Sequence, residues 1–221
     1  MPLWKSMFAT LLTLSLFSDG AQAQGWFQWS KWSRRKEMMV IGYAAVSRWE
    51  ALAINTDSEL WVKDSPHNLQ LGRGFYLVNT PGRWMGQEEE SWYCVVKARR
   101  GKIESAGKVY IPSSYEKLTP AGFVTRNLWA ADEAAIVEYI GSEAYISKPG
   151  EALRFSWTPD AEDPLLQMVI PTAVVNDDKL RAWAQCFESE DELKQVSDAT
   201  IDWKAWKIKG FPRVAGSSWL K

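Results

Sequence analysis

The sequence predicts an α+β fold that is mostly β: an antiparallel β-meander or sandwich with one or two short C-terminal helices. Three observations lead to this fold class. Between residues 38 and 111, short runs of β-branched and aromatic residues alternate with turn residues. The clearest helical period begins only near residue 176. The fourteen tryptophans have no fixed spacing and the chain has no internal repeat, which excludes a simple solenoid or propeller.

The first half of the domain is predicted to be a series of strands joined by tight turns. The polar stretch 55–58 predicts a hairpin turn. Residues 99–102, with the sequence Arg-Arg-Gly-Lys, predict a second tight turn. The expected strands cover residues 39–46, 49–54, 59–63, 75–78, 92–98 and 102–111.

A change of composition over residues 112–120 marks a possible internal boundary, which we interpret as a loop within one domain. Residues 130–140 predict a short helix ending at Gly141, with a strand as the alternative because β-branched and aromatic residues lie near its end. Pro171 lacks an amide hydrogen, so it predicts an edge position or a bulge in its strand. The strands expected in this part of the chain cover residues 144–147, 152–157 and 165–175.

Two helices and a closing strand are predicted near the C-terminus. The first helix starts at Asn176, because apolar residues then recur at i, i+3, i+4 and i+7 and form one face. Residues 189–192, Ser-Glu-Asp-Glu, fit a capping box and predict a second short helix. Residues 201–208 predict the closing strand. The apolar face of the first helix consists of Leu180, Trp183, Ala184 and Phe187.

Residues 1–23 are predicted to be a signal peptide. Lys5 precedes an apolar stretch that is too short to span a bilayer, and small residues then favour cleavage before Gln24. An uncleaved membrane anchor is the alternative. We therefore expect a periplasmic or secreted protein with a Trp- and Arg-rich N-terminal arm over residues 24–37 and a single β-rich domain over residues 38–221.

The charges of the chain nearly cancel. Removing residues 1–23 takes away one lysine and one aspartate, which leaves 25 basic and 26 acidic side chains among 198 residues. No global field then attracts the protein to nucleic acid, so we expect no nucleic-acid partner.

The two cysteines, Cys94 and Cys186, are predicted to form one disulfide, because an oxidising compartment favours pairing over free thiols. Closing so long a loop stabilises a fold by about 4 to 5 kcal/mol in the chain-entropy model. With Cys186 inside the first C-terminal helix, the bond would tie that helix to the strand that contains Cys94. A reactive thiol is the alternative, and the apolar run around Cys94 argues against it.

The N-terminal arm combines indole rings with a basic run, a composition typical of segments that contact a partner protein or a membrane surface. Covering the domain core is the alternative role of these rings. In the loop at residues 81–86, Pro and Gly flank a further tryptophan that is a candidate for exposure. The candidate binding residues are Trp26, Trp29, Trp32, Arg34, Arg35 and Trp84.

Two family resemblances are confined to this arm. Residues 29–33, Trp-Ser-Lys-Trp-Ser, resemble the WSxWS signature of type I cytokine receptors, which lies late in a fibronectin-like domain. The tryptophans spaced by three residues resemble the ladder of thrombospondin type 1 repeats, which depend on several disulfides. Because neither context accompanies the motif here, we derive no fold or function from either resemblance.

The sequence contains no complete catalytic or metal-binding pattern. His67 is the only histidine, so any serine or cysteine triad would have to use it, and a Gly-x-Ser-x-Gly elbow is missing. The acidic groups near residues 88–90, 160–163 and 188–192 lack EF-hand spacing. We therefore expect no enzymatic activity, no metal and no cofactor.

These observations predict an exported, non-catalytic binding protein that contacts an envelope or secreted macromolecule through exposed aromatic and basic residues. A protein is the expected partner, with a membrane surface or a glycan as further possibilities. One alternative function is a carbohydrate-binding module in which tryptophan rings stack on sugars, and a hydrolase that uses paired carboxylates is another.

Overall fold

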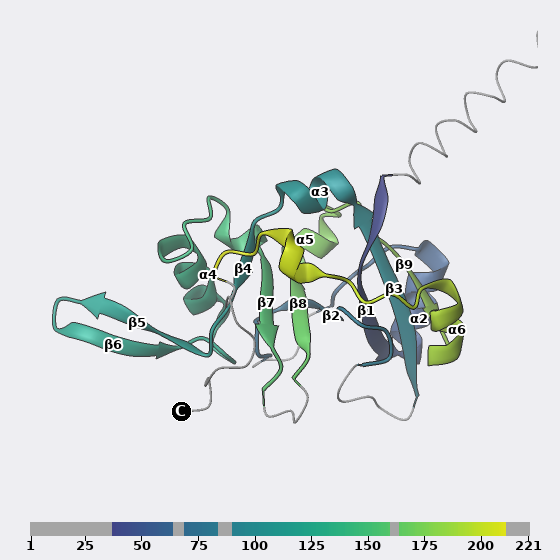
Figure 1. Cartoon of the computed structure of the whole chain (residues 1–221), viewed down its shortest axis with the longest axis horizontal. Coiled ribbons are helices and arrows are strands. Elements are labelled where there is room, and N and C mark those ends of the chain that lie inside the picture. The colour runs from purple at the N-terminus through teal and green to yellow at the C-terminus, as the bar shows by residue number, and fades with distance from the viewer. Residues whose placement is uncertain (1–36, 64–68, 84–89, 160–163, 211–221) are drawn as a thin grey trace, which may run out of the picture. The chain divides into compact units, whose positions relative to one another are not determined.

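The structure is a computed structural model that describes residues 37–63, 69–83, 90–159 and 164–210. The chain divides into two compact units, Met1–Glu37 and Met38–Lys221. Every helix and strand described below belongs to the second unit (Figure 1).

A seven-stranded sheet forms the centre of this unit, in the order β4-β7-β8-β2-β1-β3-β9. Neighbouring strands are antiparallel except for β4 and β7, which are parallel. This sheet confirms the predicted α+β, mostly β class, although the strand order is not the sequential order of a meander. The strands are β1 (Met38–Ser47), β2 (Gly74–Val78), β3 (Ser91–Arg99), β4 (Lys108–Tyr110), β7 (Leu153–Trp157), β8 (Leu166–Pro171) and β9 (Trp183–Phe187).

Short helices cover both faces of the sheet. Buried side chains of α2, α3, α5 and η2 join one apolar cluster with strand residues such as Phe155 and Met168. On the opposite face, α4 buries Ile136 and Ile140 in a second cluster, and α6 buries Leu193 in a third. The helices are α2 (Arg48–Asp57), α3 (Arg100–Ser105), α4 (Glu133–Ser142), η1 (Pro149–Glu151), α5 (Thr172–Asn176), α6 (Glu190–Val196) and η2 (Trp203–Trp206).

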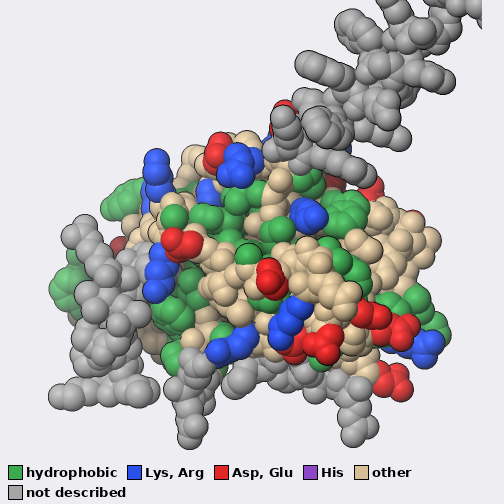
Figure 2. Space-filling view, turned by 45° about the vertical axis from the view of Figure 1, so that its right-hand side comes forward, with side chains coloured by type: hydrophobic (Ala, Val, Ile, Leu, Met, Phe, Trp, Pro, Cys, Tyr) green, Lys and Arg blue, Asp and Glu red, His purple; other side chains and the backbone are tan. Residues whose placement is uncertain are grey.

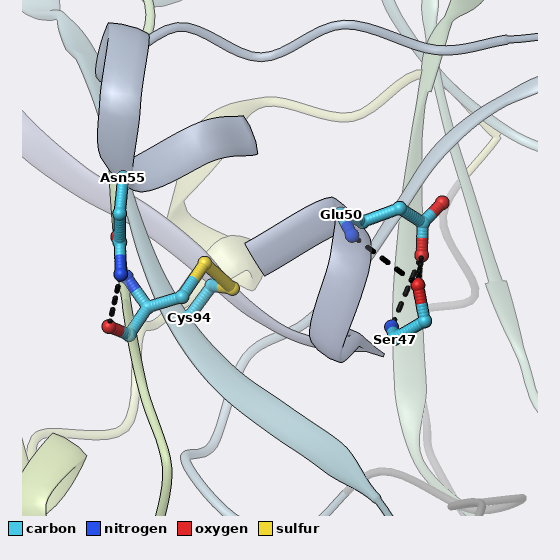
Figure 3. Close-up of a disulfide and its surroundings, with 5 residues drawn as sticks. Ser47, Glu50, Asn55 and Cys94 are labelled. Carbon is cyan, nitrogen blue, oxygen red and sulfur yellow. Dashed lines mark hydrogen bonds between the residues drawn. A yellow bond between two sulfur atoms is a disulfide. The ribbon is translucent and has the colours of Figure 1, made fainter. Parts of the chain in front are cut away.

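The prediction of a strand at residues 49–54 followed by a hairpin turn was wrong, because these residues lie in α2. Ser47 begins the helix with a full capping box: its hydroxyl accepts from the Glu50 amide at 3.3 Å, and the Glu50 carboxylate accepts from the Ser47 amide at 3.0 Å (Figure 3). This reciprocal pair satisfies amide groups that the first helical turn leaves without partners. Local capping and the helix formers Glu50, Ala51 and Leu52 therefore select a helix in place of the predicted strand.

Residues 99–102 do not form a tight turn. They lead into α3, which buries Ile103 against the sheet, and only residues 108–110 of the predicted strand 102–111 pair as β4. Residues 59–63 also form no strand: the Asn176 side-chain amide binds the Val62 backbone at 2.9 and 3.0 Å in place of a neighbouring strand.

The predicted helix from Asn176 to Phe187 was wrong, because α5 ends at Asn176 and residues 183–187 form strand β9. Asp178 and Arg181 adopt positive φ angles of 46° and 52°, which break any helix through this segment. The apolar residues fit an alternating pattern as well as a helical one, and pairing with β3 selects the strand. Cys186 therefore lies on a strand.

Other predictions for the second half have mixed outcomes. The helix expected over residues 130–140 is confirmed as α4, and the helix expected after Ser189 is confirmed as α6. Residues 144–147 form no strand, and η2 replaces the closing strand at 201–208. Pro171 ends β8 opposite Gly74, and β8 lies between β7 and β2, so the edge position was wrong.

Both outer strands of the sheet are shielded by side chains or chain segments. On β9, the Asn55 side-chain amide accepts from the Cys186 N–H at 2.8 Å and donates to the Cys186 carbonyl at 2.9 Å. At the other edge, Lys209 forms a short parallel bridge with Val109 of β4. These contacts occupy backbone groups that would otherwise recruit another strand.

The loop predicted over residues 112–120 was wrong, because residues 114–119 form the first strand of a separate two-stranded sheet. Strands β5 (Ser114–Thr119) and β6 (Gly122–Asn127) pair antiparallel over six residue pairs. Figure 1 shows this hairpin extending away from the seven-stranded sheet.

Candidate functional site

The predicted binding residues cannot be placed relative to the sheet. Trp26, Trp29, Trp32, Arg34, Arg35 and Trp84 all lie outside the described residues, as does the predicted signal peptide at residues 1–23. Their roles stay predictions.

The predicted disulfide is confirmed. Cys94 of β3 and Cys186 of β9 are direct register partners and are bonded to each other, with 92 residues of separation along the chain. Both side chains are buried in the cluster that α2 covers. The bond joins two neighbouring strands rather than a strand and a helix.

A large open groove lies beside α3, with a volume of about 1470 Å³. It brings together five segments: Met39 of β1, α3 with the start of β4, residues 145–151, the end of α5 with the turn that follows it, and the chain from η2 to Lys209. On the face drawn in Figure 2, Lys and Arg side chains border an area of hydrophobic side chains.

Basic side chains outnumber acidic ones in the lining of this groove, which we therefore call the basic groove. Seven basic side chains and two carboxylates, Glu104 and Glu151, contribute to it. Glu151 forms ion pairs with Lys148 and Lys179 at 3.5 and 3.1 Å. Five cations remain for which the described part of the chain supplies no carboxylate within ion-pair distance. They are Arg100, Lys102, Lys108, Lys207 and Lys209.

Lys108 is the buried cation of the groove. Its side chain is only 7% exposed, and its ammonium donates to the Ala106 carbonyl at 3.0 Å and to the Glu104 carbonyl at 3.5 Å. Burial lowers the pKa of Lys108 from its ordinary 10.5, while the negative charge of Glu104 opposes this effect. A buried ammonium that meets only neutral carbonyls is costly, and an anion in the groove would stabilise it.

Aromatic side chains accompany the charges. Tyr145 is 80% exposed in the groove wall, and the carbonyls of Ala144 and Tyr145 accept hydrogen bonds from Lys209 at 2.8 and 3.1 Å. Trp206 is half-buried beside Trp203, with ring centroids 6.2 Å apart. The groove therefore offers both charge and ring faces to a ligand.

The Glu151 carboxylate of the groove is suited to remaining ionised. The hydrogen bond from Lys179 lowers the pKa of Glu151, and the charge of Lys148 acts in the same direction. A general acid at neutral pH needs a raised pKa instead. Within the described residues, no group of three or more His, Cys, Asp or Glu side chains is arranged to hold a metal ion.

The acidic groups noted in the sequence do not meet in the groove as far as the structure describes them. Residues 88–89 and 160–163 lie outside the described residues. Glu190 begins α6, where its carboxylate pairs with Lys194 one turn later. Acidic residues in a first turn also interact favourably with the helix dipole.

Sequence reasoning missed the groove because its cations come from distant segments. The only local signals of a basic site are the pairs Arg99-Arg100 and Lys207-x-Lys209, and the first of them lies in the predicted turn. Folding places Arg100 and Lys207 on one groove, although 107 residues separate them along the chain.

The fold and this site define an α+β protein with a helix-covered, mostly antiparallel sheet and a basic groove beside it. Residues 69–211 match the Family of unknown function (DUF5910), and the chain belongs to that family. No curated protein matches the chain. Among the described residues, no helix has the length and apolar character needed to cross a membrane.

Proposed function

We propose that this protein is an exported, non-catalytic binding protein whose basic groove holds a segment of an acidic polysaccharide. The observation that supports this most strongly is Lys108, a buried ammonium at the groove without a carboxylate partner in the described chain. A carboxylate or sulfate group of a ligand supplies the missing countercharge.

The size of the groove favours a polymer over a small molecule. Pockets for small ligands are about 300 to 1,000 Å³ and enclose most of the ligand. The basic groove is larger, at about 1470 Å³, and it is open to solvent. Repeated negative charges along a chain would match cations that several segments contribute.

Two further features support a sugar polymer. The exposed ring of Tyr145 and the half-buried ring of Trp206 offer apolar faces on which sugar rings stack. The disulfide and the predicted signal peptide favour an extracellular or periplasmic setting, where acidic glycans are available. The proposed ligand is thus the glycan that the sequence gives as an alternative, and the proposed binding site is the groove in place of exposed tryptophans.

Calorimetric titration with a defined oligogalacturonate tests the proposal, with the fully methyl-esterified oligomer as the neutral control. We expect binding to the charged oligomer alone, and weaker binding at higher salt, because salt screens the contacts of exposed cations. Arg100→Gln and Lys207→Gln should each weaken binding several-fold. Lys63→Gln, at an exposed lysine outside the groove, should leave the affinity unchanged.

Lys108→Met should reduce the affinity by at least about tenfold, since truncating one partner of a buried charge pair commonly costs 2 kcal/mol or more. For the natural protein, affinity should fall as pH rises from the lowered pKa of Lys108 toward 10.5, because the bound carboxylate favours the charged ammonium. Tighter binding to single-stranded DNA than to the oligogalacturonate, or no difference between the charged and esterified oligomers, would contradict the proposal.

A further inference from the structure

The β5–β6 hairpin carries an apolar tip that the fold itself does not cover. Leu118 and Phe123 are direct register partners one pair before the turn, and they are 70% and 73% exposed. Pro120 and Ala121 of the turn are also exposed. Figure 1 shows this tip at the far end of the hairpin from the sheet.

The base of the hairpin is held firmly against the rest of the unit. The Tyr115 and Tyr139 rings lie 5.0 Å apart, and Lys117 forms an ion pair with Glu138, so one face of the hairpin rests on α4. Successive residues of a strand point to opposite faces. Leu118 therefore belongs to the face turned away from α4.

The turn is also ordered by its own contacts. The Thr119 hydroxyl donates to the Gly122 carbonyl at 2.8 Å, and Gly122 adopts a φ of 111°, a conformation suited to glycine. The apolar tip is thus presented by a structured arm. An isolated two-stranded hairpin is only marginally stable in water, and α4 supplies packing to one face alone.

The apolar area of the tip is small for a protein interface. Two large side chains at about seven-tenths exposure present together on the order of 200 to 350 Å², judged from about 150 to 250 Å² for a large apolar side chain. A stable protein interface buries about 800 Å² on each partner. Insertion into a lipid surface has no such requirement, because a few apolar side chains partition individually.

Polar residues then limit how deep the tip can enter an apolar medium. Thr125 donates a hydrogen bond to Glu116 at 2.5 Å, and these two residues form the next register pair on the Leu118 face. They lie two residues from the apolar pair, about 7 Å along the strands. This distance matches the 5 to 10 Å to which interfacial segments enter a bilayer.

We propose that the β5–β6 tip is a lipid-binding element that inserts Leu118 and Phe123 into the boundary between headgroups and acyl chains. Glu116 and Thr125 stay at the level of water and headgroups. This site is separate from the basic groove: no residue of the hairpin lines the groove.

Flotation of the whole protein with phosphatidylcholine vesicles tests this proposal, because neutral lipid does not engage the basic groove electrostatically. We expect the natural protein to float with the vesicles and Leu118→Ser/Phe123→Ser to reduce the bound fraction by at least about tenfold, since two large apolar side chains are lost. Trp49→Ser/Leu52→Ser serves as the matched control, because it removes two exposed apolar residues from α2 instead.

An environment-sensitive fluorophore on Ala121→Cys gives an independent measurement. Its emission should shift to the blue when vesicles are added, and it should stay unshifted in the Leu118→Ser/Phe123→Ser background. Lys108→Met should leave vesicle binding unchanged, so failure of the groove proposal and failure of this one are distinguishable. The proposal would be overturned if the α2 variant lost as much vesicle binding as the hairpin variant, or if the natural protein bound no vesicles. It would also be overturned if sedimentation equilibrium showed a dimer that the hairpin variant abolishes.

Discussion

At the scale of single residues, the ion pair between the buried Arg154 and the partly exposed Glu133 stands out. Arg154 is fully buried on β7, where Nη1 donates to Glu133 Oε2 and to the Leu71 carbonyl, each at 2.9 Å, and Nη2 pairs with Glu133 Oε1. Gly72, at a φ of 81°, leaves room for this pair, since a Cβ there would lie 2.5 Å from Arg154 Nη1. Burial also raises the pKa of nearby Tyr76 to about 12.

Glu133→Gln should lower the free energy of unfolding by about 3 kcal/mol, because it leaves a buried guanidinium without its countercharge. Urea unfolding at neutral pH measures the change. Glu138→Gln, on the same helix, breaks the exposed pair with Lys117 and should cost less than about 1 kcal/mol. Equal losses of unfolding free energy in the two variants would show that the Arg154–Glu133 pair stabilises the fold no more than the exposed Lys117–Glu138 pair does.

At the scale of elements, side-chain caps decide where several helices begin. Ser47, Asp132 and Ser189 each accept a hydrogen bond from an amide of the first turn. Only α2 among these three has the reciprocal bond, in which the Ser47 amide donates to the Glu50 carboxylate. The full box and the helix-forming residues Glu50, Ala51 and Leu52 both favour α2 as a helix.

Ser47→Ala should lower the free energy of unfolding by about 1 to 2 kcal/mol, the upper range for loss of a cap. Ser189→Ala at α6 should cost less, because its hydroxyl makes the single cap bond at 3.3 Å. Chemical denaturation of the two variants side by side gives the comparison. A larger loss at Ser189 would show that the reciprocal bond contributes little.

At the scale of the whole unit, the Cys94–Cys186 disulfide fastens edge strand β9 to β3. The loop that the bond closes includes β4, β7 and β8, which lie on the far side of β2 from β3 and β9. Asn55 binds the Cys186 backbone, so α2 and the disulfide hold the same edge (Figure 3).

Cys94→Ala/Cys186→Ala should lower the free energy of unfolding by up to about 4 to 5 kcal/mol, the value for closing a loop of this length in the chain-entropy model. Urea unfolding with and without reductant measures it. Reductant should destabilise the natural protein and leave the double variant unchanged. If reductant has no effect on the natural protein, the disulfide does not contribute to its stability.

Local patterns in the sequence predicted the fold class and several of its parts. The helices α4 and α6 and strands such as β3 and β7 follow from period, caps and turn residues. The α2 helix could have been predicted too, since Ser47 and Glu50 have the same capping-box spacing as Ser189 and Glu192. The segment 180–187 could not, because its apolar spacing fits either period and only pairing with β3 selects the strand.

The sequence alone was sufficient for an α+β class rich in strands and for the pairing of the only two cysteines, because both depend on local composition or on simple counting. Tertiary structure decided the strand order, the strand that holds Cys186, the projecting hairpin and the gathering of Arg100, Lys108 and Lys207 at one groove. The physical reason is that side-chain pattern reports the environment of each segment. It does not report which distant segments become neighbours when long loops close.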